Sequence, residues 1–324
     1  MNCTGSSSGG FRERLGADEA VAPELSAHGI PLSRRLTFSD VLVHSPIRAL
    51  PAVSRSPDAE CRVCAGSSRF VFEQEVLAYK IGYFDCPHCG YLQTETPYWL
   101  NEAYVSAIND ADTGILKRNQ QNVGKVIVTL LSLGVLKGTV VDYASGYGIL
   151  VRLLRDAGVN ALWTDKYCEN LLARGFEAKS NRCDLLTAFE VFEHLVEPVS
   201  ELRAMLAEAP AVLLSTELIR SEQAPPTDWW YFGKDHGQHV GFFRVRTLQT
   251  MARMLGCHYD TDGRSIHLFS SHAIPRTWRP LAARSNWWRA IARGALRSRT
   301  ISDSEQIVRA RAATALQSPA SISR

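Results

Sequence analysis

The stretch that decides the fold of this 324-residue chain is Val140-Val141-Asp142-Tyr143-Ala144-Ser145-Gly146-Tyr147-Gly148-Ile149-Leu150-Val151. It predicts a short buried strand, a glycine-bearing turn and the start of a helix that runs to Gly158. This order places backbone N–H groups, a helix N-terminus and a carboxylate at the carboxyl edge of a sheet, where open α/β folds bind ligands. The stretch therefore predicts a site for a nucleoside-containing cofactor.

The spacing of the turn favours one cofactor class over another. A dinucleotide loop has the pattern G-x-G-x-x-G, but Val151 stands three residues after Gly148, where the third glycine belongs. The pattern Asp-x-Ala-x-Gly-x-Gly instead resembles the first motif of class I S-adenosylmethionine (SAM)-dependent methyltransferases, with Ala144 in place of the first glycine. An ordinary strand-to-helix connection is the alternative for the turn taken alone. If the turn needs a positive φ at Ala144, affinity for the cofactor suffers.

Three further apolar runs predict more strands of the same sheet. Residues 159–165 end in Asp165, about 20 residues beyond the turn, where a ribose-binding carboxylate lies in such folds. Residues 183–195 predict a third strand, and 211–217 a fourth. The loop after the third strand carries the candidate side chains Glu190, Glu193 and His194. Strands that alternate with helical patterns indicate a parallel sheet with right-handed crossovers.

Helical spacing of apolar residues places helices between these strands. They are expected at 98–108 with a continuation through Asn122, at 126–134, at 198–208, and at 247–256 with a cap at Thr247. Asp262-Gly263 predicts the turn of a hairpin formed by residues 257–270. An antiparallel hairpin that closes the sheet edge is also a feature of class I methyltransferases.

The composition sets limits on the function. With 45% hydrophobic residues, the chain can build one sizeable core with appendages. A formal net charge of +3 is too small to demand a nucleic-acid partner. The first ten residues hold no apolar segment typical of an export signal, and no window approaches roughly 18 uninterrupted apolar residues. A soluble, cytoplasmic protein is the expectation.

Four of the eight cysteines form two C-x-x-C pairs, Cys61/Cys64 and Cys86/Cys89. Each pair is followed closely by a glycine, so the backbone N–H groups can fold toward sulfur, as a structural Zn(Cys)₄ site requires. A redox dithiol and incidental thiols are the alternatives. His88 is a bystander, because four thiolates already close the zinc shell. The zinc ribbon is expected at residues 60–95, either as a staple or as part of a substrate pocket.

The two ends of the chain differ in composition from its middle. Residues 1–59 mix Ser, Gly, Pro and Arg and predict a mobile N-terminal extension with one element near 36–43. Residues 276–324 predict a basic C-terminal tail or helix, with nine arginines from Arg276 to Arg311. A basic amphipathic helix can contact an anionic membrane surface or nucleic acid. The alternative, which is favoured, is a surface helix with its charges in water.

Residues 228–243 gather aromatic and imidazole side chains in a predicted loop. Trp230, Tyr231, Gln238 and His239 are candidates to stack on a sugar or ring substrate and to bond its hydroxyls. The alternative is that these aromatic side chains pack against one another as the small hydrophobic core of a lid. Tyr104 is a further substrate candidate. Arg118 is a candidate to meet the carboxylate of an amino-acid-like cofactor, or else a solvated surface arginine.

With these residues in view, the chain from about Cys61 to Phe269 resembles a bacterial family of class I methyltransferases that carry an N-terminal zinc ribbon. The motifs that carry the resemblance are the two C-x-x-C pairs, Trp99-Leu100-Asn101-Glu102-Ala103-Tyr104, Asp142 to Gly148, Tyr167-Cys168-Glu169-Asn170, Phe189-Glu190-Val191-Phe192-Glu193-His194-Leu195 and Gly237-Gln238-His239-Val240. Members of that family are often linked to modification of sugars or other glycans.

The resemblance implies a Rossmann-like α/β fold, with a mostly parallel sheet and an antiparallel closing hairpin at residues 96–275, beside the ribbon. It implies methyl transfer from SAM to a small-molecule acceptor, a sugar or nucleotide sugar. The cofactor residues are then Asp142, Ala144, Gly146, Gly148, Asp165, Glu190 and Arg118. His194, oriented by Glu193, is the first candidate for general base, and His239 is the second.

Two other functions stay open at this stage. The ribbon and the arginine tail could grip RNA, which would make the chain an RNA methyltransferase. Alternatively, the chain could be a non-catalytic, zinc-stabilised binding module that has lost affinity for SAM through Ala144.

Overall fold

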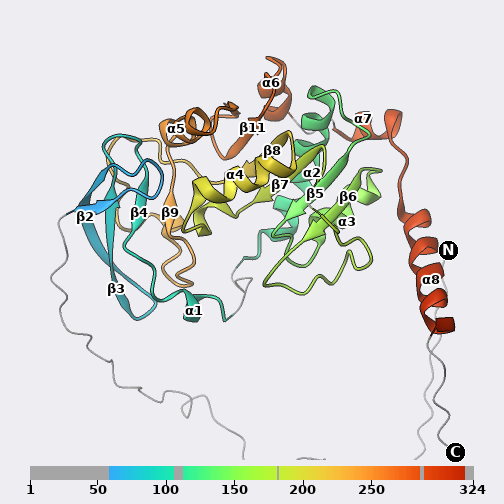
Figure 1. Cartoon of the computed structure of the whole chain (residues 1–324), viewed down its shortest axis with the longest axis horizontal. Helices are drawn as coiled ribbons and strands as arrows, with labels where there is room; N and C mark the ends of the chain where they lie inside the picture. The colour runs from blue at the N-terminus through green and yellow to red at the C-terminus, as the bar shows by residue number, and fades with distance from the viewer. Residues whose placement is uncertain (1–57, 106–111, 181, 285–287, 318–324) are drawn as a thin grey trace, which may run out of the picture. The chain divides into compact units, whose positions relative to one another are not determined.

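The computed structural model describes residues 58–105, 112–180, 182–284 and 288–317, and Figure 1 shows its two sheets. The element predicted near 36–43 lies outside the described residues. The smaller sheet is antiparallel throughout, with the order β1-β2-β3-β4-β9. Its strands are β1 (Asp58–Glu60), β2 (Ser67–Val76), β3 (Tyr79–Asp85), β4 (Leu92–Thr94) and β9 (Gly241–Phe242).

The larger sheet has the order β10-β11-β8-β7-β5-β6, with four parallel strands at its centre and one edge. The parallel strands are β5 (Thr139–Tyr143), β6 (Asn160–Thr164), β7 (Leu185–Phe189) and β8 (Ala211–Ser215). The hairpin of β10 (His258–Thr261) and β11 (Ile266–Ser270) adds to β8 in the antiparallel direction. This mixed sheet confirms the predicted Rossmann-like class and its closing hairpin.

The helices agree with the sequence in position more than in extent. They are α1 (Leu100–Ala103), α2 (Ile115–Ser132), α3 (Ile149–Asp156), α4 (Pro198–Glu208), α5 (Val245–Leu255), α6 (Trp278–Ala283), α7 (Trp288–Ala295) and α8 (Thr300–Gln317), with single 3₁₀ turns η1 (Phe192–His194) and η2 (Trp230–Phe232). The helix expected at 98–108 is reduced to one turn in the residues that are described. The next two predicted segments are parts of one long helix, α2.

The start of α5 is a further correction. The helix begins at Val245, with Arg244 as its N-cap, and not at Thr247. The backbone N–H of Arg244 donates to Oγ1 of Thr247 at 3.1 Å, so Thr247 bonds back to the cap from the third helical position. The glycine stop is confirmed, because Gly256 takes a left-handed φ of 65° at the C-cap.

Alternation along β8 shows why the sheet is covered on both faces. Val212 and Leu214 pack in one hydrophobic cluster with α4 and α5, and Ala211 and Leu213 pack in another with α2 and α3. Successive side chains of a strand point to opposite faces, so a continuously apolar strand needs a helix layer on each side. The large sheet is therefore the middle layer of three.

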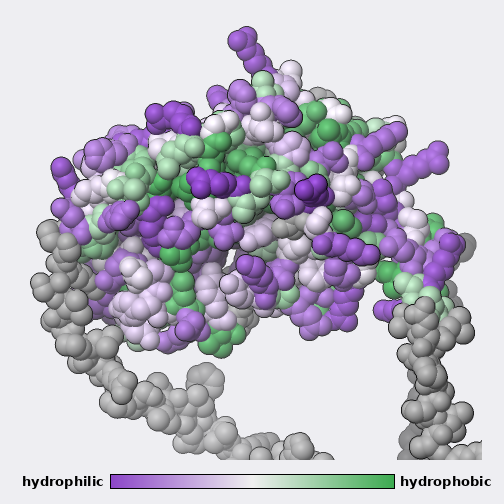
Figure 2. Space-filling view, in the orientation of Figure 1, coloured by the Kyte–Doolittle hydropathy of each residue, from purple (hydrophilic) through white to green (hydrophobic). Residues whose placement is uncertain are grey.

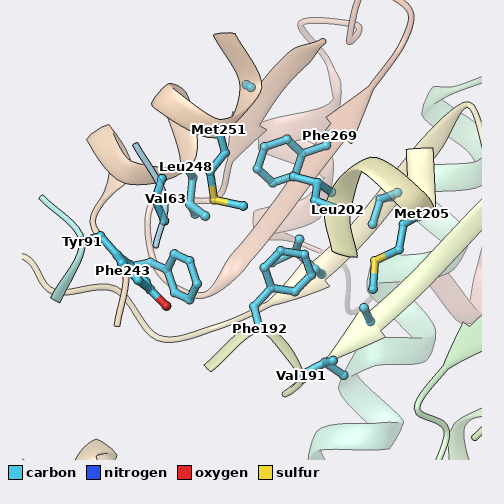
Figure 3. Packing of buried hydrophobic residues seen from close by; sticks show 14 of the residues in the cluster. Val63, Tyr91, Val191, Phe192, Leu202, Met205, Phe243, Leu248, Met251 and Phe269 are labelled. Atoms are coloured by element: carbon cyan, nitrogen blue, oxygen red, sulfur yellow. The ribbon is translucent and has the colours of Figure 1, made fainter. Parts of the chain in front are cut away.

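The ribbon shares its core with the large sheet. Figure 3 shows Val63 and Tyr91 of the ribbon packed beside Leu248 and Met251 of α5 and beside Phe243. Strand β9, about 150 residues further along the chain, completes the ribbon's sheet by pairing with β4. The two parts are thus joined by side-chain packing and by strand pairing.

Two buried side chains help to tie the C-terminal segment to the sheet domain. Trp278 of α6 is fully buried and donates its indole N–H to Oγ1 of Thr129 at 2.9 Å. Asp303 of α8 accepts both Nε and Nη2 of the buried Arg155, each at 2.7 Å. Hydrophilic side chains cover most of the face in Figure 2. Among the described residues, no helix combines the length and apolar character that a membrane span needs.

Candidate active site

A cavity of about 1130 Å³ opens at the carboxyl ends of β5, β6 and β7. Asp142, Ala144 and Gly146 of the predicted turn line it together with Asp165 and Glu190. The predicted residues Gly148 and Glu193 are not on its wall. The predicted substrate residues Tyr104, Trp230, Tyr231, Gln238 and His239 line it as well. Arg118 and His194 complete the set of predicted residues on its wall. The structure therefore brings into one cavity residues that are spread over about 140 positions of the chain, from Leu100 to His239, as open α/β sheets do at this edge.

The turn after β5 has left-handed backbone at three places. The φ angles are 55° at Ala144, 57° at Gly146 and 81° at Gly148. A Cβ on Gly148 would lie 2.3 Å from the side-chain amide of Asn170, so glycine is required there by space as well as by φ. Gly148 is also the N-cap of α3, which leaves the first N–H groups of that helix facing the cavity end of the sheet.

The positive φ of Ala144 gives a stability prediction. A left-handed conformation costs an L-residue roughly 1–2 kcal/mol in the folded state. Glycine avoids this cost, but its extra freedom in the unfolded chain lowers the free energy of unfolding by about 0.5–1 kcal/mol. We expect Ala144→Gly to raise the free energy of unfolding by about 0.5–1 kcal/mol in urea titrations at an unchanged m-value. Ala157→Gly is the matched control, because φ is −77° there and the same change should destabilise. Equal destabilisation by both changes would contradict the strain at Ala144.

Asp165 joins the turn to the loop after β6. Its Oδ2 accepts the N–H of Gly146 at 2.8 Å, and its Oδ1 accepts the N–H groups of Tyr167 and Cys168 at 2.7 and 2.8 Å. The sequence predicted only a ribose contact for this carboxylate. The role of fixing two loops was missed, because the backbone partners of a side chain leave no sequence pattern.

Two other acids at this edge have buried partners. Asp142 accepts the hydroxyl of Thr187 at 2.6 Å, and burial raises the pKa of Asp142 to about 7. Glu190 has a positive φ of 55° and accepts the hydroxyl of Ser215 at 2.5 Å. A strained backbone held in place by surrounding bonds is a frequent feature of functional sites.

Arg118 is held by an acid that the sequence analysis did not single out. Its Nη1 donates to Oδ1 of Asp112 at 2.7 Å, and its Nη2 pairs with Oδ2 of the same carboxylate. Asp112 also lines the cavity. Arg118 therefore lies on the wall as a cation that is already paired with a carboxylate. Its predicted contact with a cofactor carboxylate stays a prediction.

The two histidines predicted as bases stand together on the wall of the cavity. The rings of His194 and His239 are 4.8 Å apart at 86°. The hydroxyl of Tyr104 is hydrogen-bonded to Nδ1 of His194 at 3.1 Å. Burial lowers the pKa of both histidines, to about 4 for His239, so both rings are neutral at pH 7.

Glu193 is fully buried next to these histidines. Burial first, and then the charge of Glu190, raises the pKa of Glu193 to about 8, against the effect of the nearby Tyr231 and Thr216 hydroxyls. The two hydroxyls lie near Glu193 but are hydrogen-bonded to each other at 3.2 Å, and among the described residues neither carboxylate oxygen has a partner with the geometry of a hydrogen bond. A carboxylate without a partner in a buried position is costly, so this group indicates a ligand or a proton at the site.

The predicted substrate residues divide by exposure. Trp230 is 74% exposed at the rim, and Tyr104 stacks on Tyr167, a residue to which the sequence gave no role. Tyr231 and Gln238 are buried, and each serves the framework as well. The hydroxyl of Tyr231 accepts the N–H of Glu217 at 3.0 Å, and Nε2 of Gln238 donates to the carbonyl of Ala103 at 2.8 Å.

The four ribbon cysteines form one cluster. Their Sγ atoms all lie within 4.8 Å of one another, and the pairs Cys61/Cys89 and Cys64/Cys86 are 3.5 Å apart. A tetrahedral zinc ion with Zn–S bonds of about 2.3 Å would need S–S separations of about 3.8 Å, so the four sulfurs suit it. In the first knuckle the positive φ falls on Ala65, at 55°, and not on Gly66.

Comparisons with known proteins agree with this fold. Residues 116–261 match the model of a family described as a methyltransferase domain. The matched residues are 146 of the 324 and include β5, β6, β7, β8 and β10 of the larger sheet. No curated protein matches the sequence.

Several solved structures are similar to part of the chain. TnmH is 16% identical with a TM-score of 0.39, over 54% of this chain and 62% of that one. CalO1, a methyltransferase in calicheamicin biosynthesis solved with SAH, is 15% identical with a TM-score of 0.35, over 54% of this chain and 60% of that one. Magnesium protoporphyrin IX methyltransferase from Synechocystis PCC 6803, with bound SAH, is 15% identical with a TM-score of 0.35, over 52% and 90%. The matched part of this chain thus spans about three fifths of the length of TnmH and of CalO1.

Proposed function

We propose that the chain transfers a methyl group from SAM to a hydroxyl of a small polar acceptor, a sugar or nucleotide sugar. The observation that carries the proposal is the single cavity of about 1130 Å³, which is lined both by the left-handed turn and by the two histidines. Its volume suffices for two small ligands, because pockets for one drug-sized ligand are about 300–1,000 Å³.

The residues at the turn suit SAM. The sulfonium is a cation, and the carboxylates of Asp165 and Glu190 line the same wall as the turn. The N–H groups of the left-handed turn and the N-terminus of α3 suit the polar atoms of the cofactor. In this arrangement Asp165 holds the turn in shape and offers its remaining lone pairs to the ribose.

The part of the cavity around His194 and His239, here called the acceptor end, suits a hydroxylated acceptor. Tyr104 and the exposed Trp230 offer aromatic faces, and His194 and His239 offer ring nitrogens. Aromatic faces that alternate with hydrogen-bonding groups are typical of sugar sites. The acceptor oxygen forms a bond to the methyl carbon while the S–C bond breaks toward sulfur, and the hydroxyl proton leaves. His194, with a neutral ring in the cavity, is the proposed acceptor of that proton, and His239 is the second candidate.

The ribbon is proposed to hold a structural Zn²⁺ through Cys61, Cys64, Cys86 and Cys89. The folded ribbon in turn supports the acceptor end of the cavity. Nη2 of Arg62 and the N–H of Thr94 donate to the carbonyl of Val240 at 2.6 and 3.1 Å, directly beside His239. The indole of Trp99 donates to the carbonyl of Gly237 at 2.7 Å.

Calorimetry with SAM and SAH, followed by a screen of nucleotide sugars with methyl-labelled SAM, tests the function. We expect one cofactor molecule per chain and label transfer to at least one acceptor, reduced about 10²–10⁴-fold in His194→Ala if His194 removes the proton. If neither SAM nor SAH gives a calorimetric binding signal, the proposed methyl transfer is wrong. Transfer to RNA in the same screen would replace the sugar as acceptor, and full turnover in His194→Ala would remove only the base assignment.

A further inference from the structure

Three side chains from two separate segments meet at the acceptor end of the cavity, where His194 and His239 line the wall and Glu193 is buried behind them. One ligand-type atom each of Glu193, His194 and His239 lies within 4.8 Å of the others. Glu193 and His194 belong to the 3₁₀ turn that follows β7, and His239 precedes β9, which pairs with the ribbon. Two imidazoles and one carboxylate at such separations are a donor set for a divalent metal ion.

The carboxylate of Glu193 gives independent support for a bound ion. Its side chain is 0% exposed, and no described residue hydrogen-bonds to either oxygen. By contrast, the neighbouring Glu190 is bonded to Ser215 at 2.5 Å. A buried carboxylate without a hydrogen-bond partner, with one oxygen within 4.8 Å of a ring nitrogen of each of two histidines, suits the role of a metal ligand.

The outer contacts of the histidines favour the same interpretation. Nδ1 of His239 lies 2.6 Å from the carbonyl of Tyr231, which can only accept, so Nδ1 carries the proton and the lone pair is on Nε2. Nδ1 of His194 is engaged by the hydroxyl of Tyr104 at 3.1 Å, which again leaves Nε2. Metal-binding histidines are regularly oriented by such a bond from their second ring nitrogen.

We propose that Glu193, His194 and His239 bind a divalent transition-metal ion that receives the acceptor hydroxyl. Two nitrogens and a carboxylate suit Mn²⁺, Co²⁺, Fe²⁺ or Zn²⁺ better than Mg²⁺ or Ca²⁺, which prefer oxygen ligands throughout. Three protein ligands leave positions for one or two oxygens of a substrate. The inference rests on the proposed function for its purpose, but the binding of the ion does not depend on SAM.

The site changes the task of His194. A hydroxyl bound to a divalent ion loses its proton more readily, so water can take that proton and no histidine has to act as the base. The overall balance is unchanged: acceptor hydroxyl and SAM give the methyl ether, SAH and one proton. An acceptor with two neighbouring oxygens, as in the vicinal diol of a sugar, could occupy two open positions at once.

Titration of the zinc-loaded, full-length protein with Mn²⁺, followed by the electron paramagnetic resonance signal of free Mn²⁺, tests the site. We expect one Mn²⁺ per chain beyond the ribbon zinc. Glu193→Gln, which keeps shape and volume, and His239→Ala should weaken Mn²⁺ binding by more than about 100-fold. Tyr104→Phe, which removes only the outer contact of His194, should weaken it by about 10-fold.

His236→Ala is the matched control, because this histidine lines the same cavity with its ring 4.9 Å from that of His239 but is outside the cluster. It should bind Mn²⁺ as the wild type does. No Mn²⁺ bound by the wild type, or wild-type affinity in Glu193→Gln and His239→Ala, would overturn the proposal. SAM binding measured on the same samples separates the two ideas: intact SAM binding without Mn²⁺ binding removes the metal site alone.

Discussion

Cys86→Ser is expected to release the ribbon metal and to unfold the ribbon. A structural zinc site contributes on the order of 10 kcal/mol to the folding of a segment that is too small for its own core. Cys86 is fully buried, and its Sγ lies 3.5 Å from that of Cys64. A serine hydroxyl cannot replace the thiolate, so zinc content should fall from about one ion per chain to near zero.

The loss should extend beyond the ribbon because its core is shared. Val63 and Tyr91 are buried against Leu248 and Met251, so their withdrawal exposes one face of α5 (Figure 3). Hydrogen exchange should therefore rise in residues 58–95 and 241–255, while β5 and β7 keep their protection. The acceptor end should also loosen, because Arg62 and Thr94 hold Val240 beside His239.

Cys257→Ser is the control for this change. Cys257 is half-buried and lies outside the cluster, with its Sγ 3.7 Å from the carbonyl of Ala252. It should retain zinc and the exchange pattern of the wild type. Unchanged metal content in Cys86→Ser would exclude Cys86 as a ligand. A wild type that is purified without zinc and loses two thiols on mild oxidation would favour the redox dithiol instead.

The parts of the fold that follow from local pattern were predictable. Apolar runs such as Ala211–Ser215 mark buried strands, and Gly256 marks a helix end through its own backbone freedom. The pairing of β9 with β4 was not, because a two-residue strand at Gly241–Phe242 has no periodicity and its partner is about 150 residues away. The ion pair of Arg155 with Asp303 was not predictable either, because no sequence pattern links the two residues.

The site shows the same division. The turn at Ala144 and the acid at Asp165 follow from the order of strand, loop and helix, and they do meet at one cavity. The sequence also drew attention to Glu193, His194 and His239, but as a base and its orienting partner. The unpartnered state of Glu193 and the fixed Nδ1 atoms of the histidines depend on contacts between segments, which only the structure contains.

Asp165→Ala is expected to weaken SAM binding by about 100-fold or more, which corresponds to about 2.7 kcal/mol. The carboxylate accepts three backbone N–H groups, from Gly146, Tyr167 and Cys168. Hydrogen bonds to a charged group contribute about 1.5–3 kcal/mol each, so both loops at the cofactor end lose their common anchor. The proposed ribose contact disappears with them. Calorimetry with SAM and with SAH measures the effect, and turnover at saturating SAM separates loss of affinity from loss of rate.

Asp184→Ala is the matched change at the other edge of the sheet. Its carboxylate also accepts a backbone N–H, that of Thr139 at 2.7 Å, but Asp184 precedes β7 and does not line the cavity. It should cost stability and leave the dissociation constant of SAM unchanged. Should Asp165→Ala bind SAM within about threefold of the wild type, Asp165 would be a loop anchor only, because a group that fixes the turn and contacts the ribose cannot be removed without a change in the affinity for SAM. The cofactor would then have to lie away from the β5–β6 edge, and the assignment of the turn as its cradle would be wrong.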